Sequence, residues 1–194
     1  KDHWCDAPGM PPERSTAYLG YANTASSLLI ALLAPLLGSI ADQGNGKRWF
    51  LLGFTLLGAA GTALLPLAGK GEYVFAAVLF AVAAFGFSGN NLFSDALLTD
   101  VAKPERYDRV SALGYALGYV GSGALFVACT FAVREPARFG LDGSIAAVGA
   151  CFVVTAIWWV VFTLPAMFCV RETPAVPAAG GGPPPTALRF HFGM

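Results

Sequence analysis

The sequence predicts an all-α integral membrane protein with five transmembrane helices. The first observation is a set of five long apolar stretches, at residues 18–40, 49–68, 73–98, 110–133 and 145–170. Each reaches the roughly 20 apolar residues with which a helix crosses a hydrocarbon core of about 30 Å. The second is composition, since 56% of the 194 residues are hydrophobic and only 12% are charged, against about 25% charged in soluble proteins.

The segments on either side of the predicted bundle, which covers residues 18–172, differ from it in composition. Residues 1–17 are polar and contain several prolines, which predicts a non-cytoplasmic polar segment rather than a signal peptide. Residues 173–194 contain GGGPPP and predict a disordered tail or linker, because such a composition buries too little apolar surface to fold. The first residue is Lys1 and the number of spans is odd, so we expect a piece of a longer protein.

Charge, cysteines and motifs exclude several classes of function. Lysine and arginine together number 12, as do aspartate and glutamate, and this balance argues against a nucleic-acid partner. The cysteines form no CxxC pair, and His3 and Cys5 are too few to make a metal site. No GxGD, GxSxG, HExxH or Walker motif occurs. We therefore expect no metal, no cofactor and no enzymatic activity.

Basic residues flank the spans unequally, and this predicts an orientation. Six lie on the side that holds the loops after the first and third spans, and four lie on the other side. Cytoplasmic loops carry the excess of Lys and Arg, so the first side is predicted to be cytoplasmic. The six are Lys47, Arg48, Lys103, Arg106, Arg109 and Arg171, and the four are Arg14, Lys70, Arg134 and Arg138.

The first span carries a stripe of small and polar residues. At about 100° per residue the members of the stripe share one face of a helix, which predicts contact with protein or water rather than with lipid. Asn23 and Ser27 are the candidates on this face for a solute path. The stripe consists of Gly20, Asn23, Thr24, Ser27, Ala31, Ala34 and Gly38.

The loop after the first span reads GSIADQGNGKR. Gly38 permits close helix packing, Asp42 lies at the membrane edge, and Lys47 and Arg48 begin the next helix. A carboxylate at Asp42 could cap a neighbouring helix N-terminus or pair with a basic residue such as Arg109. The alternative is an ordinary short cytoplasmic loop that obeys the charge rules.

The third span contains the residues that are most costly to place in a membrane. Ser88, Asn91 and Asp95 lie on one side of the helix, with Asn90 near them, and an ionisable group at that depth needs a partner or a cavity. On one interpretation Asp95 lines a solute path, as a proton carrier or as the counter-ion of an amino group. On the other it lies near the cytoplasmic headgroups, held by Lys103 or Arg106.

The fourth span has a stripe of glycines beside a row of hydroxyl groups. Gly114, Gly118 and Gly121 have the spacing that lets two helix backbones approach closely in a membrane. The hydroxyl groups either bind a polar solute or bond to neighbouring helices, and the sequence leaves both interpretations open. They belong to Ser111, Tyr115, Tyr119 and Ser122.

The remaining features are predicted to be structural. Asp100 and Asp108 are expected to cap helices or to pair with Arg106 and Arg109. The fifth span has no charge and few polar groups, which predicts a lipid-facing outer helix with a kink at Pro165.

Two segments resemble the major facilitator superfamily. The loop at residues 38–48 is similar to the signature between the second and third helices of each half, although Gln43 stands where that family usually has Arg. Residues 90–123, NNLFSDALLTDVAKPERYDRVSALGYALGYVGSG, resemble the branch that contains autophagy-related vacuolar amino-acid effluxers and their bacterial relatives, as do YANTASSLLIALLAPLLGSIAD before them and AIWWVVFTLPAMFCVRE after them. The resemblance covers residues 20–172 and places them as helices two to six of twelve.

The resemblance implies a secondary active or facilitative transporter of small polar solutes, with amino acids as the candidate class, that works by alternating access. The implied partners are membrane lipid, the solute and the remaining helices of a longer transporter, in a bacterial inner membrane or a vacuolar membrane. A membrane scaffold that docks a partner and transports nothing is the alternative. The expected solute path consists of Asn23, Ser27, Asn91, Asp95, Ser111, Tyr115 and Tyr119, and the expected conformational-switch loop of Gly38, Asp42, Lys47 and Arg48.

Overall fold

The chain folds as a bundle of long helices. The computed structural model describes residues 12–42, 46–69 and 71–172, and within those ranges every regular element is helical. Five of the helices are long and apolar enough to cross a membrane, which confirms the predicted all-α membrane fold. They are α2 (Pro12–Asp42), α3 (Lys47–Leu64), α4 (Tyr73–Val101), α5 (Tyr107–Arg134) and α6 (Ser144–Cys169), joined in part by the 3₁₀ turns η1 (Leu65–Leu67), η2 (Pro104–Arg106) and η3 (Pro136–Phe139).

The predicted boundaries differ from the observed ones chiefly at the first span. Helix α2 begins at Pro12 rather than at residue 18, so part of the predicted polar segment is helical. The rest of that segment and the whole of residues 173–194 lie outside the described part of the chain. Prolines mark several other boundaries, because a proline lacks the N–H that would continue a helix but fits its first turn. Pro104 and Pro136 both open 3₁₀ turns in this way.

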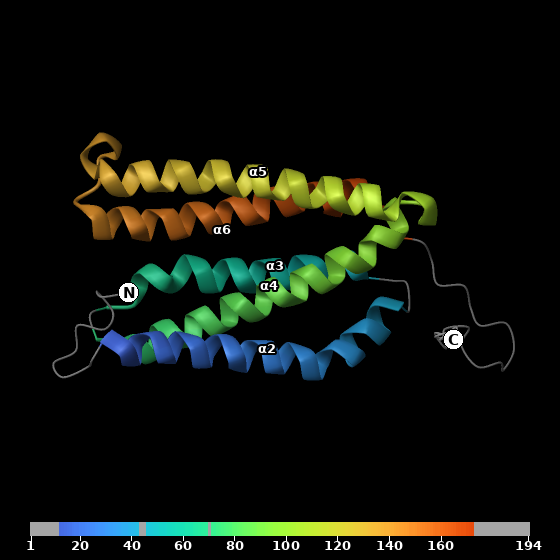
Figure 1. The fold of residues 1–194 in the computed structure, drawn as a ribbon, viewed down its shortest axis with the longest axis horizontal. Helices are drawn as coiled ribbons and strands as arrows, with labels where there is room; N and C mark the ends of the chain where they lie inside the picture. Colours follow the sequence, from blue (N-terminus) through green and yellow to red (C-terminus); the bar gives the residue numbers. More distant parts are fainter. Residues whose placement is uncertain (1–11, 43–45, 70, 173–194) are drawn as a thin grey trace, which may run out of the picture.

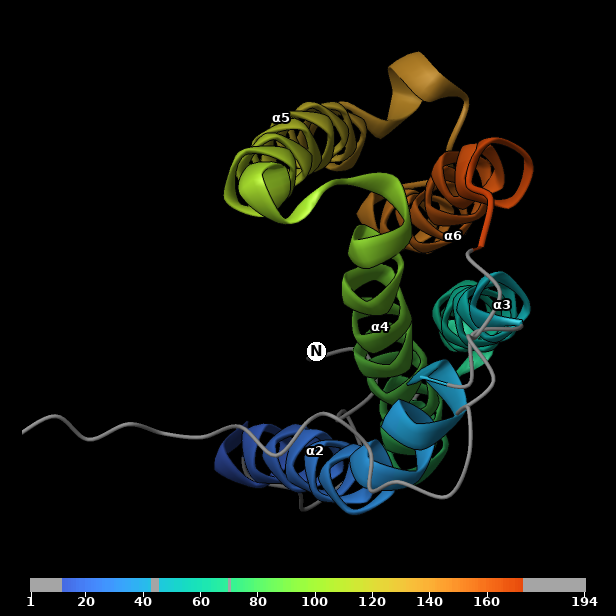
Figure 2. The same ribbon diagram turned by 90° about the vertical axis from the view of Figure 1, so that its right-hand side faces the viewer.

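Consecutive helices run in opposite directions, so that the start of α3 and the ends of α4 and α6 meet at one end of the molecule (Figure 1). Helix α4 is central: it packs against α2 and α3, which lie on different sides of it (Figure 2). Helix α6 packs against both α3 and α5. Helix α6 also leaves many apolar side chains exposed, among them Ile157, Phe162 and Phe168, and its contact with lipid stays a prediction.

A cluster of apolar side chains joins α2, α3 and α4. Phe93 is fully buried at its centre, surrounded by Leu37, Leu51 and Leu97. The ring of Phe93 stacks on that of Phe50, with centroids 5.1 Å apart. Because lipid tails are as apolar as these side chains, the cluster stabilises the bundle through close van der Waals packing rather than through the hydrophobic effect.

Glycines bring α3 and α4 into close contact. A methyl group added at Gly86 would collide with the backbone of Gly58 and would lie 2.8 Å from the carbonyl oxygen of Phe54. One added at Gly61 would lie 2.9 Å from the backbone nitrogen of Ala83. Small residues at such crossings are the usual means by which membrane helices pack.

A buried polar cluster joins α3, α4 and α6. The side-chain amide of Asn90 donates to the hydroxyl of Thr55 at 2.6 Å, and that hydroxyl lies 3.5 Å from the hydroxyl of Thr163. The two threonine hydroxyls also donate to carbonyl groups of their own helices. Asn90 therefore serves the packing of α4 on α3.

Candidate functional site

A cavity of about 640 Å³ lies mainly between α4 and the first half of α5. Leu51 of α3 and Ala166 and Val170 at the end of α6 complete its wall. Among the described residues that line it, Asp95 alone is charged. The lining from α4 and α5 consists of Phe87, Asn91, Ser94, Asp95, Leu97, Leu98, Val101, Val110, Ser111, Gly114, Tyr115, Gly118, Tyr119 and Ser122.

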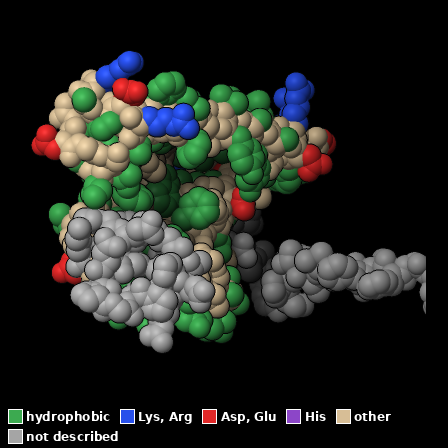
Figure 3. Space-filling model, turned by 60° about the vertical axis from the view of Figure 1, so that its left-hand side comes forward, with side chains coloured by type: hydrophobic (Ala, Val, Ile, Leu, Met, Phe, Trp, Pro, Cys, Tyr) green, Lys and Arg blue, Asp and Glu red, His purple; other side chains and the backbone are tan. Residues whose placement is uncertain are grey.

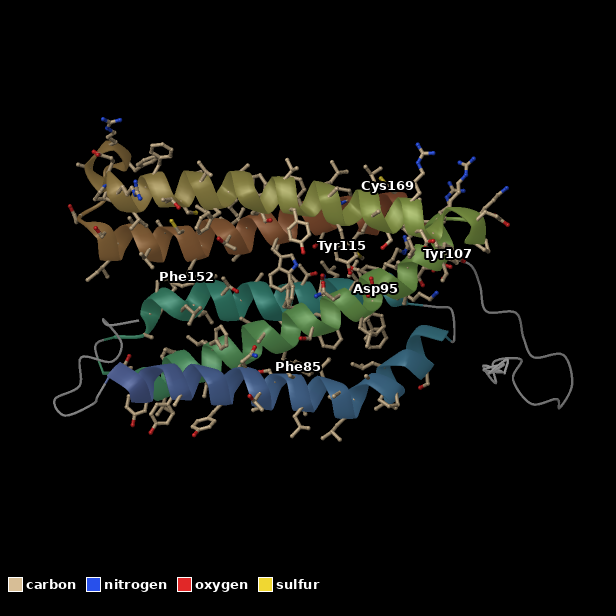
Figure 4. The ribbon with its side chains drawn as sticks, in the orientation of Figure 1. Phe85, Asp95, Tyr107, Tyr115, Phe152 and Cys169 are labelled. Atoms are coloured by element: carbon tan, nitrogen blue, oxygen red, sulfur yellow. The ribbon has the colours of Figure 1, made fainter. Side chains whose placement is uncertain are left out.

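Five of the seven residues predicted for a solute path line this one cavity. They are Asn91 and Asp95 from α4, and Ser111, Tyr115 and Tyr119 from α5. Figure 4 shows Asp95 and Tyr115 on these two helices, with both side chains in the space between them. The helical repeat explains the arrangement, because residues four apart lie on the same face of a helix.

Asp95 has none of the cationic partners that the sequence suggested. Within the described ranges, no ion pair joins its carboxylate to Lys103 or Arg106, and its side chain is exposed to the cavity. A carboxylate that lines a cavity in a membrane-spanning helix is free to meet a cation or a proton. This is the chemical capacity that the first interpretation of Asp95 requires.

Asn23 and Ser27 lie elsewhere. Both are exposed on α2, and neither lines the cavity. Helix α2 meets α4 through the adjacent face, where Ser26 is buried and its hydroxyl lies 2.9 Å from the carbonyl oxygen of Ala81 on α4. The polar stripe of α2 thus has no neighbour among the described helices that would explain it, and its place in a solute path stays a prediction.

The glycine stripe of α5 is also uncovered. A methyl group at Gly114 or Gly118 would meet nothing within 4 Å, and one at Gly121 would only touch Trp158 at 3.9 Å. Gly114 and Gly118 border the cavity instead. Close packing of another helix on this stripe stays a prediction.

The cytoplasmic end predicted from the basic residues holds a network of charged groups. Lys47 at the start of α3 forms an ion pair with Asp100 near the end of α4, with 2.9 Å between Nζ and Oδ2, and both side chains are nearly buried. The expected pairing of Asp100 with Arg106 is thus replaced by a bond between helices. Of the other residues in the predicted switch loop, Gly38 would have open space around an added methyl group, and the side chain of Asp42 lies outside the described part.

Glu172, which lies shortly after the end of α6 at Cys169, caps the start of α3. Its carboxylate accepts hydrogen bonds from the backbone N–H groups of Gly46, Lys47 and Arg48, and from the Arg48 side chain at 3.1 Å. Burial by itself raises the pKa of Glu172, but these hydrogen bonds, that of the Arg48 N–H foremost, outweigh it and lower the pKa below its ordinary value. Capping a neighbouring helix start was one of two roles that the sequence suggested for Asp42, and at α3 a carboxylate far along the chain has this role.

Comparison with known proteins connects this arrangement to a family. The family model for vacuole effluxer Atg22-like proteins matches residues 12–184. This chain belongs to that family.

Two curated relatives of this Atg22-like chain illustrate the range of the family. An uncharacterized MFS-type transporter of Bacillus subtilis, YxiO, is 37% identical over 165 residues, which cover 84% of this chain and 39% of the relative. Autophagy-related protein 22 of Coccidioides immitis is 22% identical over 217 aligned residues, which cover 84% of this chain and 35% of the relative. The chain thus spans under half the length of either relative, and no solved structure matches it.

Sequence reasoning missed two residues of the charged network in this Atg22-like chain. Glu172 was left out of the network, and Asp100 was assigned to a neighbour in its own loop. An acidic residue shortly after a membrane helix, on the side where a basic pair begins another helix, is the signal that could have indicated the cap. Nothing local signals the partner of Asp100, because Lys47 is more than fifty residues away in the sequence.

Proposed function

We propose that the protein to which this chain belongs carries small polar solutes across a membrane by alternating access, with amino acids as the candidate class. The α4–α5 cavity is proposed as part of the solute path. The observation that carries the proposal is the composition of the cavity wall, in which a carboxylate, an amide and several hydroxyl groups from two membrane-spanning helices face one space. Polar groups in that position are costly to a protein that only packs helices.

The chemistry of the wall suits a solute with an amino group. The carboxylate of Asp95 can pair with an ammonium ion, and Asn91 and the hydroxyls of Tyr115 and Tyr119 can accept or donate hydrogen bonds. Leu97 and Leu98 provide an apolar surface for the rest of the solute. In a membrane these electrostatic contacts are stronger than in water, because the surroundings have a low dielectric constant.

The network at the cytoplasmic end supports the conformational part of the proposal. Lys47 and Asp100 join α3 to α4, and Glu172 and Arg48 join α3 to the end of α6. Three helices linked in this way move as one body, and rocking one helical body against another is how alternating access proceeds. The family membership supports the same function.

Solute counterflow in proteoliposomes that contain the full-length gene product tests the proposal. Vesicles preloaded with an unlabelled amino acid mixture should take up labelled amino acids faster than unloaded vesicles, because alternating access returns the carrier fastest when it is loaded. Uptake that is no faster than in protein-free vesicles, across the whole amino acid mixture, would remove amino acids as the candidate class. Uptake without acceleration by preloading would indicate a channel instead.

A further inference from the structure

A second cavity of about 530 Å³ forms a groove between α5 and α6, at the end of the bundle opposite to the charged network. It runs along α5 from Ser122 to Arg134, and Phe152 lines it from α6 (Figure 4 labels this residue). At about 1.5 Å per residue, the distance along the helix axis from Ser122 to Arg134 is about 18 Å. This is close to half of the roughly 30 Å hydrocarbon core, which is the depth that one acyl chain of one leaflet occupies.

The groove offers little to a polar solute. Its wall consists mainly of apolar side chains, and two of the polar side chains in it already contact backbone carbonyl groups. The hydroxyl of Thr130 donates to the carbonyl of Phe126 at 2.8 Å, and the thiol of Cys151 lies 3.7 Å from the carbonyl oxygen of Cys129. The wall therefore fits a chain of methylene groups better than a solute with hydrogen-bonding groups.

The mouth of the groove carries a cation. Arg134 ends α5 and borders the groove, its side chain is exposed, and no ion pair engages it among the residues that the structure describes. The neighbouring Arg138 pairs with Glu135 at 3.7 Å, and it does not line the groove. A guanidinium at a helix end lies where lipid phosphates lie, and it forms strong paired hydrogen bonds with phosphate.

We propose that this groove binds an anionic phospholipid of the non-cytoplasmic leaflet, with one acyl chain between α5 and α6 and its phosphate on Arg134. The proposal does not depend on which solute is transported. On the face shown in Figure 3, most charged side chains lie toward the ends of the molecule, and hydrophobic side chains cover much of the surface between them, as expected of a protein in contact with lipid. A helix from another part of the protein is the rival occupant.

Photo-crosslinking lipids can test the proposal on the full-length protein in nanodiscs. Two probes carry the same diazirine-labelled acyl chain, one with a phosphatidylglycerol headgroup and one with phosphatidylcholine. Adducts should concentrate in residues 122–134 and 148–155, with about fivefold more from the anionic probe, which is the preference that one arginine near a membrane surface gives. Arg134→Gln should abolish the preference, and the matched control Arg138→Gln should keep it.

Three outcomes would overturn the proposal. Adducts spread evenly over the apolar faces of all helices would show that the groove has no special affinity for lipid. Equal labelling by the two probes, or a preference that survives in Arg134→Gln, would remove Arg134 as the phosphate ligand. A groove free of adducts, in protein whose other helices are labelled, would indicate that a helix fills it.

Discussion

Single polar side chains hold the helices of this bundle in register. Asn90 and Thr55 bond α4 to α3 in the middle of the bundle, and Lys47 and Asp100 bond the same helices at one end. Each of these groups would be costly to leave unpaired in a low-dielectric interior. Glu172 is the most connected of them, because one carboxylate satisfies three backbone N–H groups that have no partner within α3.

We predict that Glu172→Gln destabilises the bundle by about 1–2 kcal/mol at neutral pH, because an amide caps a helix start less well than a carboxylate. The folded-state pKa of Glu172 is lowered, so its ionised form stabilises the fold above the ordinary carboxyl pKa of 4.5, and this contribution is lost as the pH falls through the lower folded value. Thermal unfolding should be measured in detergent from pH 7 downward. The difference in stability between Glu172→Gln and wild type should shrink as the pH falls below the ordinary carboxyl pKa.

A control separates this effect from loss of charge in general. Glu135 also pairs with an arginine, but both side chains are largely exposed, and exposed pairs contribute little. Glu135→Gln should therefore unfold like wild type. An equal loss in both variants, or a Glu172→Gln deficit that stays constant at low pH, would contradict the assigned cap.

At the scale of helices, glycine has two different roles that the sequence pattern alone did not separate. The predicted packing glycines, Gly114 and Gly118 of α5, face the cavity, whereas Gly58 and Gly86, which were not singled out, bring α3 and α4 together. All four lie in apolar helices, where a glycine can allow a neighbouring helix to approach closely. Only the positions of the neighbouring helices show which glycines are in close contact.

We predict that Gly86→Ala destabilises this chain by about 1–3 kcal/mol, the usual cost of overpacking, because the added methyl group would press on the α3 backbone. Gly118→Ala should be neutral or slightly stabilising, since it meets nothing within 4 Å and alanine favours a helix over glycine by about 1 kcal/mol. The thermal stability of the two purified variants would be compared in the same detergent. Equal losses would contradict the assigned packing of α3 on α4.

The sequence predicted the helices well and their partners poorly. Each membrane-spanning helix can be recognised from its own residues, because crossing a membrane needs a run of about 20 apolar residues. That Asn91 and Asp95 lie on the same side of α4 could also be predicted, since residues on one helix face keep together in any packing. By contrast, the pairs Lys47–Asp100 and Arg48–Glu172 depend on contacts between distant helices, and no local pattern encodes them.

For the whole molecule, the orientation follows from where the loops lie. The Lys47 network and the loop after α4 are at one end, and the loop between α5 and α6 is at the other (Figure 1). We predict that the first end is cytoplasmic, because it holds more of the basic residues. Glu105 and Asp142 are exposed in these two loops and are suited to labelling.

The test uses an impermeant maleimide on intact bacterial cells that express a variant without native cysteines. Asp142→Cys should be labelled from outside, and Glu105→Cys should be labelled only after the membrane is permeabilised. The reverse pattern would invert the topology. It would also move the α5–α6 groove to the cytoplasmic leaflet.

The central claim for the molecule is that solute passes along the α4–α5 cavity. The most direct measurement is amino acid flux in proteoliposomes by the full-length protein with Asp95→Asn or Tyr115→Phe, compared with matched variants outside the cavity, Asp142→Asn and Tyr21→Phe. The account predicts that the first two lower flux about tenfold or more at unchanged protein abundance, as expected when about 1.4 kcal/mol or more of binding is lost, and that the controls transport normally. Wild-type flux in Asp95→Asn and Tyr115→Phe would contradict it.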